Sequence, residues 1–149
     1  MSQGRHLVTV SETFRVARPP EAVFDYTQDY GRRSQWDQAV LDATVLSEDP
    51  RRVRVRVRGI GSFTVEYRLF RRPERTSAAF VDPDSRWLIG GGGSWSYEPD
   101  GEGTAWTQTN TMESRSNWIL GLLAPLFERQ LRSSMRQAMA RARDILEAS

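Results

Sequence analysis

The sequence predicts an α+β fold, in which a curved antiparallel sheet of seven strands wraps around one long C-terminal helix and two short helices follow the first strand. Apolar and polar residues alternate through most of the stretch from Val8 to Met112, which is the period of half-buried strands. From Phe127 to Ile145 apolar residues instead recur at steps of three and four, the period of an amphipathic helix. Two short helices cannot cover the inner face of such a sheet, so we expect the long helix to lie across it.

The composition fits one domain over residues 1–149 and excludes several kinds of chemistry. The chain has no cysteine, one histidine and 21 basic residues, all of them arginine. Zinc sites built on cysteine, thiol nucleophiles, a P-loop lysine and Schiff-base catalysis are therefore excluded. A Ser-His-Asp triad would need His6, which stands at the start of the first predicted strand, where a surface histidine is the ordinary outcome. We expect no metal and no cofactor.

Charge and hydropathy indicate a cytoplasmic protein that does not span a membrane. The 19 acidic residues nearly balance the arginines, so nucleic acid is not an expected partner. The N-terminal sequence MSQGRHLVTV lacks the apolar core of a signal peptide, and the longest apolar run, Trp118–Phe127, is too short to cross a bilayer. The sequence leaves the oligomeric state open, a dimer included.

The first predicted strand runs from His6 to Val16 and ends before a pair of prolines. Pro20 and the acidic residue after it are typical of a first helical turn, so we expect a short helix through about Tyr26. Asp29, Tyr30 and Gly31 should end that helix. A second short helical segment is expected over Arg32–Asp37.

A strand over Val40–Glu48 and a hairpin centred on Gly59 and Gly61 are predicted next. Opposed residues of an antiparallel pair share a face, so the hairpin should have one apolar face. That face would carry Val53, Val55, Val57, Phe63, Val65, Tyr67 and Leu69.

The other face of the hairpin carries a stripe of arginines at positions 54, 56 and 58 against Thr64, Glu66 and Arg68. We expect Glu66 to lie opposite Arg54 or Arg56, according to the register of the turn. A nucleic-acid groove would interleave exposed aromatic residues, which the stripe lacks. It is therefore interpreted as the solvated side of the sheet.

Three more strands are expected before the long helix. They cover Ser77–Val81, ended by turn residues at 82–84, then Arg86–Glu98, and then Gly103–Ser114. The last two are joined by a turn of Pro99, Asp100 and Gly101.

A glycine run, Gly90–Gly93, lies inside the sixth predicted strand. It could form a mobile gate at the mouth of a pocket, or a bulge that curves the sheet around the helix, and we favour the bulge. The C-terminal helix either begins near Pro125 or is kinked there.

Two segments resemble the helix-grip domains of the START-related, polyketide cyclase and lipid-transport superfamily, often called SRPBCC. In the first, Phe14–Val40, the matching residues are Pro19, Pro20, Glu21, Val23, Phe24, Asp29, Trp36 and Asp37. In the second, Gly93–Thr109, an aromatic strand is followed by a Pro-Asp-Gly turn and a Gly-Thr restart. The resemblance covers almost the whole chain and implies a helix-grip fold. It does not supply a reaction, because such folds host many functions.

Where sheet and helix diverge, we expect a pocket of the kind that binds small molecules. Its predicted ligand-binding residues are Tyr67, Trp95, Tyr97, Trp106, Gln108, Asn110, Met112, Phe127, Leu131 and Met135, with Phe63 and Val65 beside them. Most of these side chains would serve equally well as core packing. Gln108 and Asn110 are more informative, because a buried amide without a partner costs about 1–3 kcal/mol. We hypothesise that they hydrogen-bond a ligand.

Three functions are consistent with this sequence. The leading one is binding, and by extension transport, of a hydrophobic small molecule such as a lipid, polyketide or isoprenoid. The second is a polyketide cyclase or dehydrase, with base and donor drawn from Glu12, Tyr67, Tyr97 and Asn110 if these converge. The third is a protein-interaction module whose core is filled. No catalytic residue can be assigned from the sequence.

Overall fold

The computed structural model describes residues 5–115 and 118–149, and its seven strands form one antiparallel sheet. The strand order across the sheet is β1-β7-β6-β5-β4-β3-β2. The elements along the chain are β1 (Arg5–Val16), α1 (Pro20–Thr27), η1 (Tyr30–Gln35), β2 (Val40–Glu48), β3 (Arg51–Val57), β4 (Gly61–Arg71), β5 (Arg75–Asp84), β6 (Leu88–Asp100), β7 (Gly103–Arg115) and α2 (Trp118–Glu147). The predicted helix-grip fold is confirmed.

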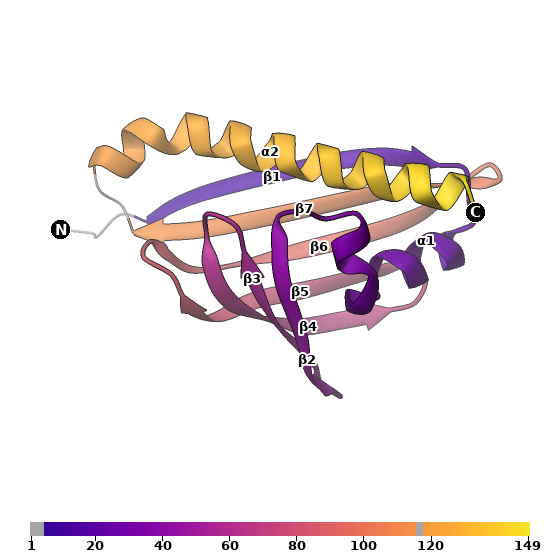
Figure 1. The fold of residues 1–149 in the computed structure, drawn as a ribbon, viewed down its shortest axis with the longest axis horizontal. Coiled ribbons are helices and arrows are strands. Elements are labelled where there is room, and N and C mark those ends of the chain that lie inside the picture. Colours follow the sequence, from indigo (N-terminus) through magenta and orange to yellow (C-terminus); the bar gives the residue numbers. More distant parts are fainter. Residues whose placement is uncertain (1–4, 116–117) are drawn as a thin grey trace.

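The sheet curves around α2, as Figure 1 shows. Helix α2 lies along β1, and α1 lies near the C-terminal end of α2 while contacting β6 and β7. The strands β2 and β3 form the opposite side of the sheet. The inner face is therefore enclosed by α2 along its length and by α1 and η1 at one end.

The second short helix, η1, is a 3₁₀ helix that begins earlier than predicted. The Asp29 carboxylate accepts a hydrogen bond of 2.9 Å from the backbone N–H of Gly31 and so caps the helix. Tyr30 and Gly31 were expected to break the helical structure, but with this cap they start a new turn. The helix consequently covers Tyr30–Gln35 and not Arg32–Asp37.

The register of the β3–β4 hairpin corrects one predicted pair. Val57 lies opposite Gly61, and this register brings Glu66 opposite Arg52, whereas Arg54 faces Thr64. Glu66 was expected opposite Arg54 or Arg56, which is wrong, because the turn is centred on Gly59, one or two residues earlier than those pairings require. The guanidinium of Arg52 lies 3.6 Å from the Glu66 carboxylate.

The apolar face of the hairpin is buried as predicted at Val53, Val55, Phe63 and Val65. A register shift between Tyr67 and Leu69 interrupts the alternation in β4. After it, the ring of Phe70 packs edge-on against Tyr67 and Phe24, at centroid distances of 5.5 and 5.3 Å. Phe70 was not predicted to join this inner surface.

Strand β5 is longer than predicted, because the expected turn residues at positions 82–84 belong to it. A register shift lets Asp84 pair with Ser62 after Val81 has paired with Thr64. Asp82 takes a positive φ of 50°, which absorbs the extra residue.

The glycine run lies inside β6, with a register shift between Leu88 and Gly90, so the predicted bulge is present. Gly91 has φ 145°, and a Cβ there would collide with the carbonyl oxygen of Thr111. A Cβ on Gly92 would lie 2.8 Å from the carbonyl oxygen of Ala78. The missing side chains thus allow β5, β6 and β7 to approach closely where the sheet bends.

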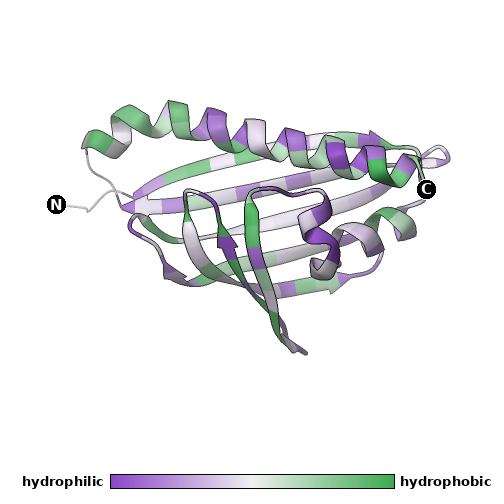
Figure 2. Cartoon of the chain, in the orientation of Figure 1, coloured by the Kyte–Doolittle hydropathy of each residue, from purple (hydrophilic) through white to green (hydrophobic). Residues whose placement is uncertain are grey.

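A single helix, α2, runs through Pro125 without a separate first turn. Its packed face centres on Met135, Ala138, Met139 and Ala142, each less than a tenth exposed, with Leu131 and Ile145 partly buried. In Figure 2, apolar and polar residues alternate along this helix, whereas its first turns are mostly apolar. No helix in residues 5–115 and 118–149 is long and apolar enough to cross a membrane.

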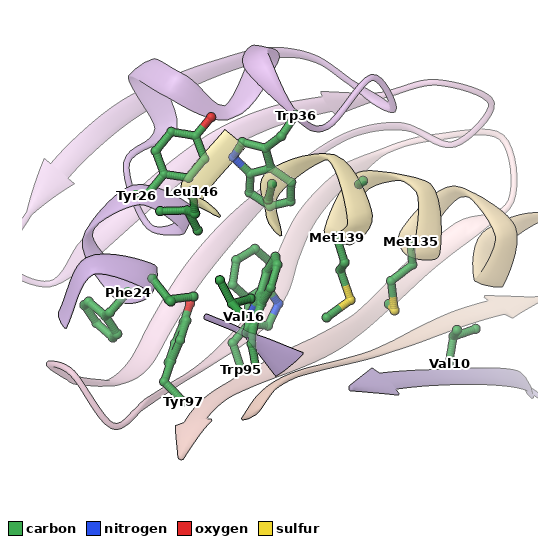
Figure 3. Close-up of a cluster of buried hydrophobic side chains, with 14 residues drawn as sticks. Val10, Val16, Phe24, Tyr26, Trp36, Trp95, Tyr97, Met135, Met139 and Leu146 are labelled. Atoms are coloured by element: carbon green, nitrogen blue, oxygen red, sulfur yellow. The ribbon is translucent and has the colours of Figure 1, made fainter. Parts of the chain in front are cut away.

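The main core lies beneath the C-terminal half of α2 (Figure 3). The indole of Trp36, from the segment after η1, meets those of Trp95 and Trp106 edge-on at 6.0 and 5.7 Å. Met139 packs over this aromatic cluster and is fully buried. Helix and sheet are therefore in direct contact at this end.

We expect Met139→Ala to lower the free energy of unfolding by about 2–5 kcal/mol, because it leaves a cavity at this contact. The matched control is Arg136→Ala, an exposed position on the same helix, which should change stability by less than about 0.5 kcal/mol. Urea denaturation followed by tryptophan fluorescence measures both. Equal effects of the two substitutions would contradict the packing described.

Candidate ligand-binding cavity

An inner cavity of about 130 Å³ lies between α2 and the sheet, beside the main core. This volume is close to that of a cavity of about 150 Å³ that is known to take up benzene. Most of the wall is apolar, and all seven strands and α2 contribute to it. The apolar and small residues of the wall are Val10, Ala39, Val40, Val55, Val57, Ile60, Phe63, Val65, Ala78, Phe80, Gly93, Trp95, Met112, Leu131, Met135 and Ala138.

The structure places the ten predicted ligand-binding residues in three locations. The inner cavity is lined by Tyr67, Trp95, Gln108, Asn110, Met112, Leu131 and Met135. Tyr97 and Trp106 are buried in the main core, with their rings stacked at 6.5 Å. Phe127 lies outside the inner cavity, against the ring of Trp87. Ligand binding by any of the ten stays a prediction.

Sequence reasoning missed the contribution of η1 and the residues after it, which close one end of the inner cavity. Tyr30, Arg33 and Asp37 line it there. Arg33 is only 5 % exposed, and its guanidinium lies 4.5–4.8 Å from the ring centroids of Tyr30, Trp36 and Trp95. Its Nη1 is 3.5 Å from the Asp37 carboxylate. The aromatic residues around this segment were the available signal, but arginine is so rarely buried that nothing in the sequence indicated a place for Arg33 at the cavity wall.

At this end, side chains of α1, η1, β4 and β6, together with Gln28, form a chain of hydrogen bonds that runs in one direction. The Tyr67 hydroxyl donates to Gln28 Oε1 at 3.1 Å, so the Tyr30 hydroxyl, 2.9 Å away, must donate to Tyr67. Gln28 Nε2 donates to the Tyr97 hydroxyl at 2.7 Å. The Thr27 hydroxyl, 2.8 Å from that of Tyr97, donates to the carbonyl of Val23, so Tyr97 donates to Thr27.

In these hydrogen bonds, Tyr67 and Tyr97 each donate their one hydroxyl proton to another side chain of the protein. Burial raises the pKa of Tyr67 well above its ordinary value, with the neighbouring Tyr30 adding to the shift. Burial likewise raises the pKa of Tyr97. Neither phenol is thus poised to donate a proton to a bound molecule at neutral pH.

Glu12, the predicted candidate for a base, takes part in an ion pair. Its Oε1 lies 3.1 Å from Nη1 of Arg132 on α2, and its side chain is 17 % exposed. It is not among the residues that line the inner cavity. Glu12 therefore fastens α2 to β1, and it does not converge with Tyr67 and Asn110 at the cavity wall.

The two amides on β7 stand at the cavity wall, as the sequence suggested. Gln108 is 7 % exposed, and its Oε1 is buried with no hydrogen-bond partner in the described part of the chain. A Cβ on Gly93 would lie 2.6 Å from Oδ1 of Asn110, so the glycine makes room for that amide. Gln108 thus belongs to the wall of a mostly apolar cavity and carries a buried acceptor without a partner among the described residues.

Among residues 5–115 and 118–149, no three side chains of histidine, cysteine, aspartate or glutamate gather in a way that could hold an ion. The charged groups at the cavity wall are those of Arg33 and Asp37, which neutralise each other.

We expect Tyr67→Phe to be more destabilising than Tyr30→Phe. Loss of the Tyr67 hydroxyl leaves the buried Gln28 Oε1 without its donor, which costs about 1–3 kcal/mol. Loss of the Tyr30 hydroxyl removes only a bond that Tyr67 accepts, and so costs less. Paired chemical denaturation curves test this order, and the reverse order would show that the chain runs in the other direction.

Stability should also decline at alkaline pH. The pKa of Tyr67 is raised on folding, so its contribution is complete below the unfolded pKa of about 10 and is lost as pH rises through the folded value. The free energy of unfolding should therefore fall above about pH 10. The fall should be shallower in Tyr67→Phe, and denaturation curves at stepped pH measure it. Identical slopes in the two proteins would contradict the burial of this phenol.

Comparison with known proteins agrees with this architecture. Residues 8–147 match the sequence model of the family described as "Polyketide cyclase / dehydrase and lipid transport". A search of curated proteins found no match.

Three solved structures illustrate the shared fold. TTHA0849 from Thermus thermophilus is 20 % identical, with a TM-score of 0.81 over 94 % of this chain and 97 % of that one. The di-domain ARO/CYC protein BexL of the BE-7585A biosynthetic pathway is 17 % identical, with a TM-score of 0.77 over 96 % of this chain and 51 % of that one. The Zhui aromatase/cyclase from Streptomyces sp. R1128 is 20 % identical, with a TM-score of 0.68 over 96 % and 93 %.

At these identities the solved structures establish the fold alone. The family match covers nearly the whole length and agrees with the sheet, the helices and the cavity described above. The chain belongs to the polyketide cyclase/dehydrase and lipid-transport family of the SRPBCC superfamily.

Proposed function

We propose that this protein binds a small hydrophobic molecule carrying a hydroxyl group, with the hydroxyl donating to Gln108 in the inner cavity. The observation that carries the proposal is the unpaired Oε1 of Gln108 within an otherwise mostly apolar wall. A buried acceptor without a donor costs free energy, and a ligand hydroxyl would remove that cost. Family membership supports hydrophobic ligand binding in general terms.

The cavity volume bears on the competing proposals. A protein-interaction module with a filled core would leave no such space, whereas about 130 Å³ is open here. The space admits one aromatic ring of the size of benzene. A lipid, polyketide or isoprenoid would therefore place one ring or chain end in the inner cavity and extend beyond it.

A polyketide cyclase or dehydrase is the second candidate, and Asp37 is the observation that favours it. Asp37 is the one carboxylate of the described residues at the cavity wall, and an aldol cyclisation needs a base. Its Oδ1 accepts a hydrogen bond from the backbone of Ala39, and Oδ2 lies beside Arg33. Ligand binding without catalysis is the simpler proposal, because both carboxylate oxygens of Asp37 already have partners within the protein.

Binding can be tested with 4-ethylphenol and its counterpart without the hydroxyl, ethylbenzene. We expect Gln108→Leu to weaken 4-ethylphenol binding roughly threefold to tenfold, the value of one hydrogen bond, and to spare ethylbenzene. Isothermal titration calorimetry measures both affinities. An equal effect on the two compounds would show that Gln108 does not contact the hydroxyl.

The position of the probe is tested by filling the inner cavity. Ala78 lines it, whereas Ala79, the next residue of β5, points to the opposite face of the sheet. Ala78→Leu should abolish measurable binding of both compounds, and Ala79→Leu should leave it unchanged. If Ala78→Leu bound them as the wild type does, the proposed site would be wrong.

A further inference from the structure

A second hollow, here called the outer hollow, lies beside the inner cavity under the N-terminal half of α2. Its volume is about 370 Å³. It is lined by His6, Val8, Gly59, Trp87, Ser114, Leu123, Ala124, Leu126 and Phe127. Leu123 and Leu126 are 48 % and 63 % exposed, so the outer hollow opens to solvent along α2.

The two spaces follow one another along the same elements. On β1 the inner cavity is lined by Val10 and the outer hollow by Val8, two residues away on the same face. On β7 the corresponding residues are Met112 and Ser114. On α2, Leu131 lines the inner cavity, and Phe127, one helical turn earlier, lines the outer hollow. The outer hollow is therefore the continuation of the inner cavity along the helix.

Two aromatic side chains, those of Trp87 and Phe127, line the outer hollow and pack against residues of the inner-cavity wall. The rings of Trp87 and Phe127 meet edge-on, with centroids 4.5 Å apart and planes at 89°. Both residues are only partly buried and pack against the cluster that contains Ile60, Leu88 and Met112. Because Phe127 is only partly buried and turns about two side-chain torsions, its ring can change position without a movement of the backbone.

The combined volume of the inner cavity and the outer hollow, and the polarity of their walls, indicate what kind of ligand they would hold together. Together the two volumes fall within the roughly 300–1,000 Å³ of small-molecule sites, which the inner cavity alone does not reach. Polar groups gather in the inner cavity, at Arg33, Asp37, Tyr67, Gln108 and Asn110. The wall of the outer hollow is mostly apolar, and no arginine, aspartate or glutamate of the described residues belongs to it.

We propose that the outer hollow is the second half of the binding site and holds the uncharged apolar tail of an elongated ligand. The hydroxyl-bearing ring of that ligand lies in the inner cavity, and Phe127 turns aside to let the tail pass. This inference rests on the proposed function, because it assumes that the inner cavity takes the ring. It assigns to this chain a ligand class, namely neutral phenol-like molecules with a linear apolar extension.

A series of 4-alkylphenols with ethyl, butyl, hexyl and octyl tails tests the inference by calorimetry on the full chain. In the wild type we expect affinity to rise about threefold to fourfold for each added methylene, as each one is buried in the outer hollow. Ala124→Trp takes up space in the outer hollow, so a longer tail should no longer raise the affinity above that of 4-ethylphenol. The control is Leu122→Trp, at a 69 % exposed position outside both linings, which should behave like the wild type.

If Ala124→Trp fails to fold, a second variant, Phe127→Ala, tests the role of the outer hollow. Phe127→Ala removes one of the two aromatic rings, so 4-octylphenol should associate severalfold faster in stopped-flow tryptophan fluorescence. 4-Ethylphenol sets the reference rate for each protein. An unchanged rate for 4-octylphenol would show that Phe127 does not separate the two spaces.

The outcomes distinguish this inference from the proposed function. If 4-ethylphenol binds and Ala78→Leu abolishes that binding, but tail length has no effect in the wild type, the inference is overturned and the proposed function stands. A dependence on tail length that persists in Ala124→Trp overturns the inference in the same way. If no phenol binds the wild type, both fail.

Discussion

The apolar stripe of α2 must be buried against a sheet that curves away from it, and this geometric constraint determines the rest of the structure. At the C-terminal half of α2, Met139 and Ala142 contact the aromatic core directly. Toward the N-terminal half of α2, the helix and the sheet separate. There Leu131 lines the inner cavity and Phe127 lines the outer hollow. The cavity is thus a consequence of packing one long helix against a curved sheet.

The bend itself depends on backbone features that few side chains permit. Gly91 and Gly92 allow β5, β6 and β7 to approach each other where a Cβ would collide with carbonyl oxygens. Gly93, next in the chain, leaves room for the amide of Asn110 in the inner cavity. One short run of glycines therefore both shapes the sheet and clears part of the site.

The polar end of the inner cavity is held together by hydrogen bonds between side chains. Tyr30, Tyr67, Gln28, Tyr97 and Thr27 form one chain in which every hydroxyl proton is donated to a protein acceptor. The buried guanidinium of Arg33 packs among aromatic rings above it and is neutralised by Asp37. The tyrosine hydroxyls of this end are satisfied internally, whereas Gln108 Oε1 is a buried acceptor without a partner among the described residues. The arrangement fits a site that selects a ligand better than one that transfers protons.

The sequence predicted the order and type of the elements because alternation and helical period are local properties. It predicted the register of β3 and β4 less well, since the partner of Glu66 depends on whether the turn is centred on Gly59 or on a later residue, which no local pattern specifies. Trp95 and Tyr97 occupy the same face of β6, so the sequence could not tell which one lines the cavity. Which of the two lines the cavity depends on the point along β6 at which α2 and the sheet separate. Arg33 was missed because only tertiary packing makes an arginine internal.

Native mass spectrometry of gently purified protein tests the central claim, ligand binding between sheet and helix, most directly. The claim predicts that the wild type and Ala79→Leu carry a small apolar molecule with at least one oxygen, released unchanged on activation, and that Ala78→Leu carries none. A wild-type spectrum that shows the polypeptide mass alone, with no bound molecule, would contradict it.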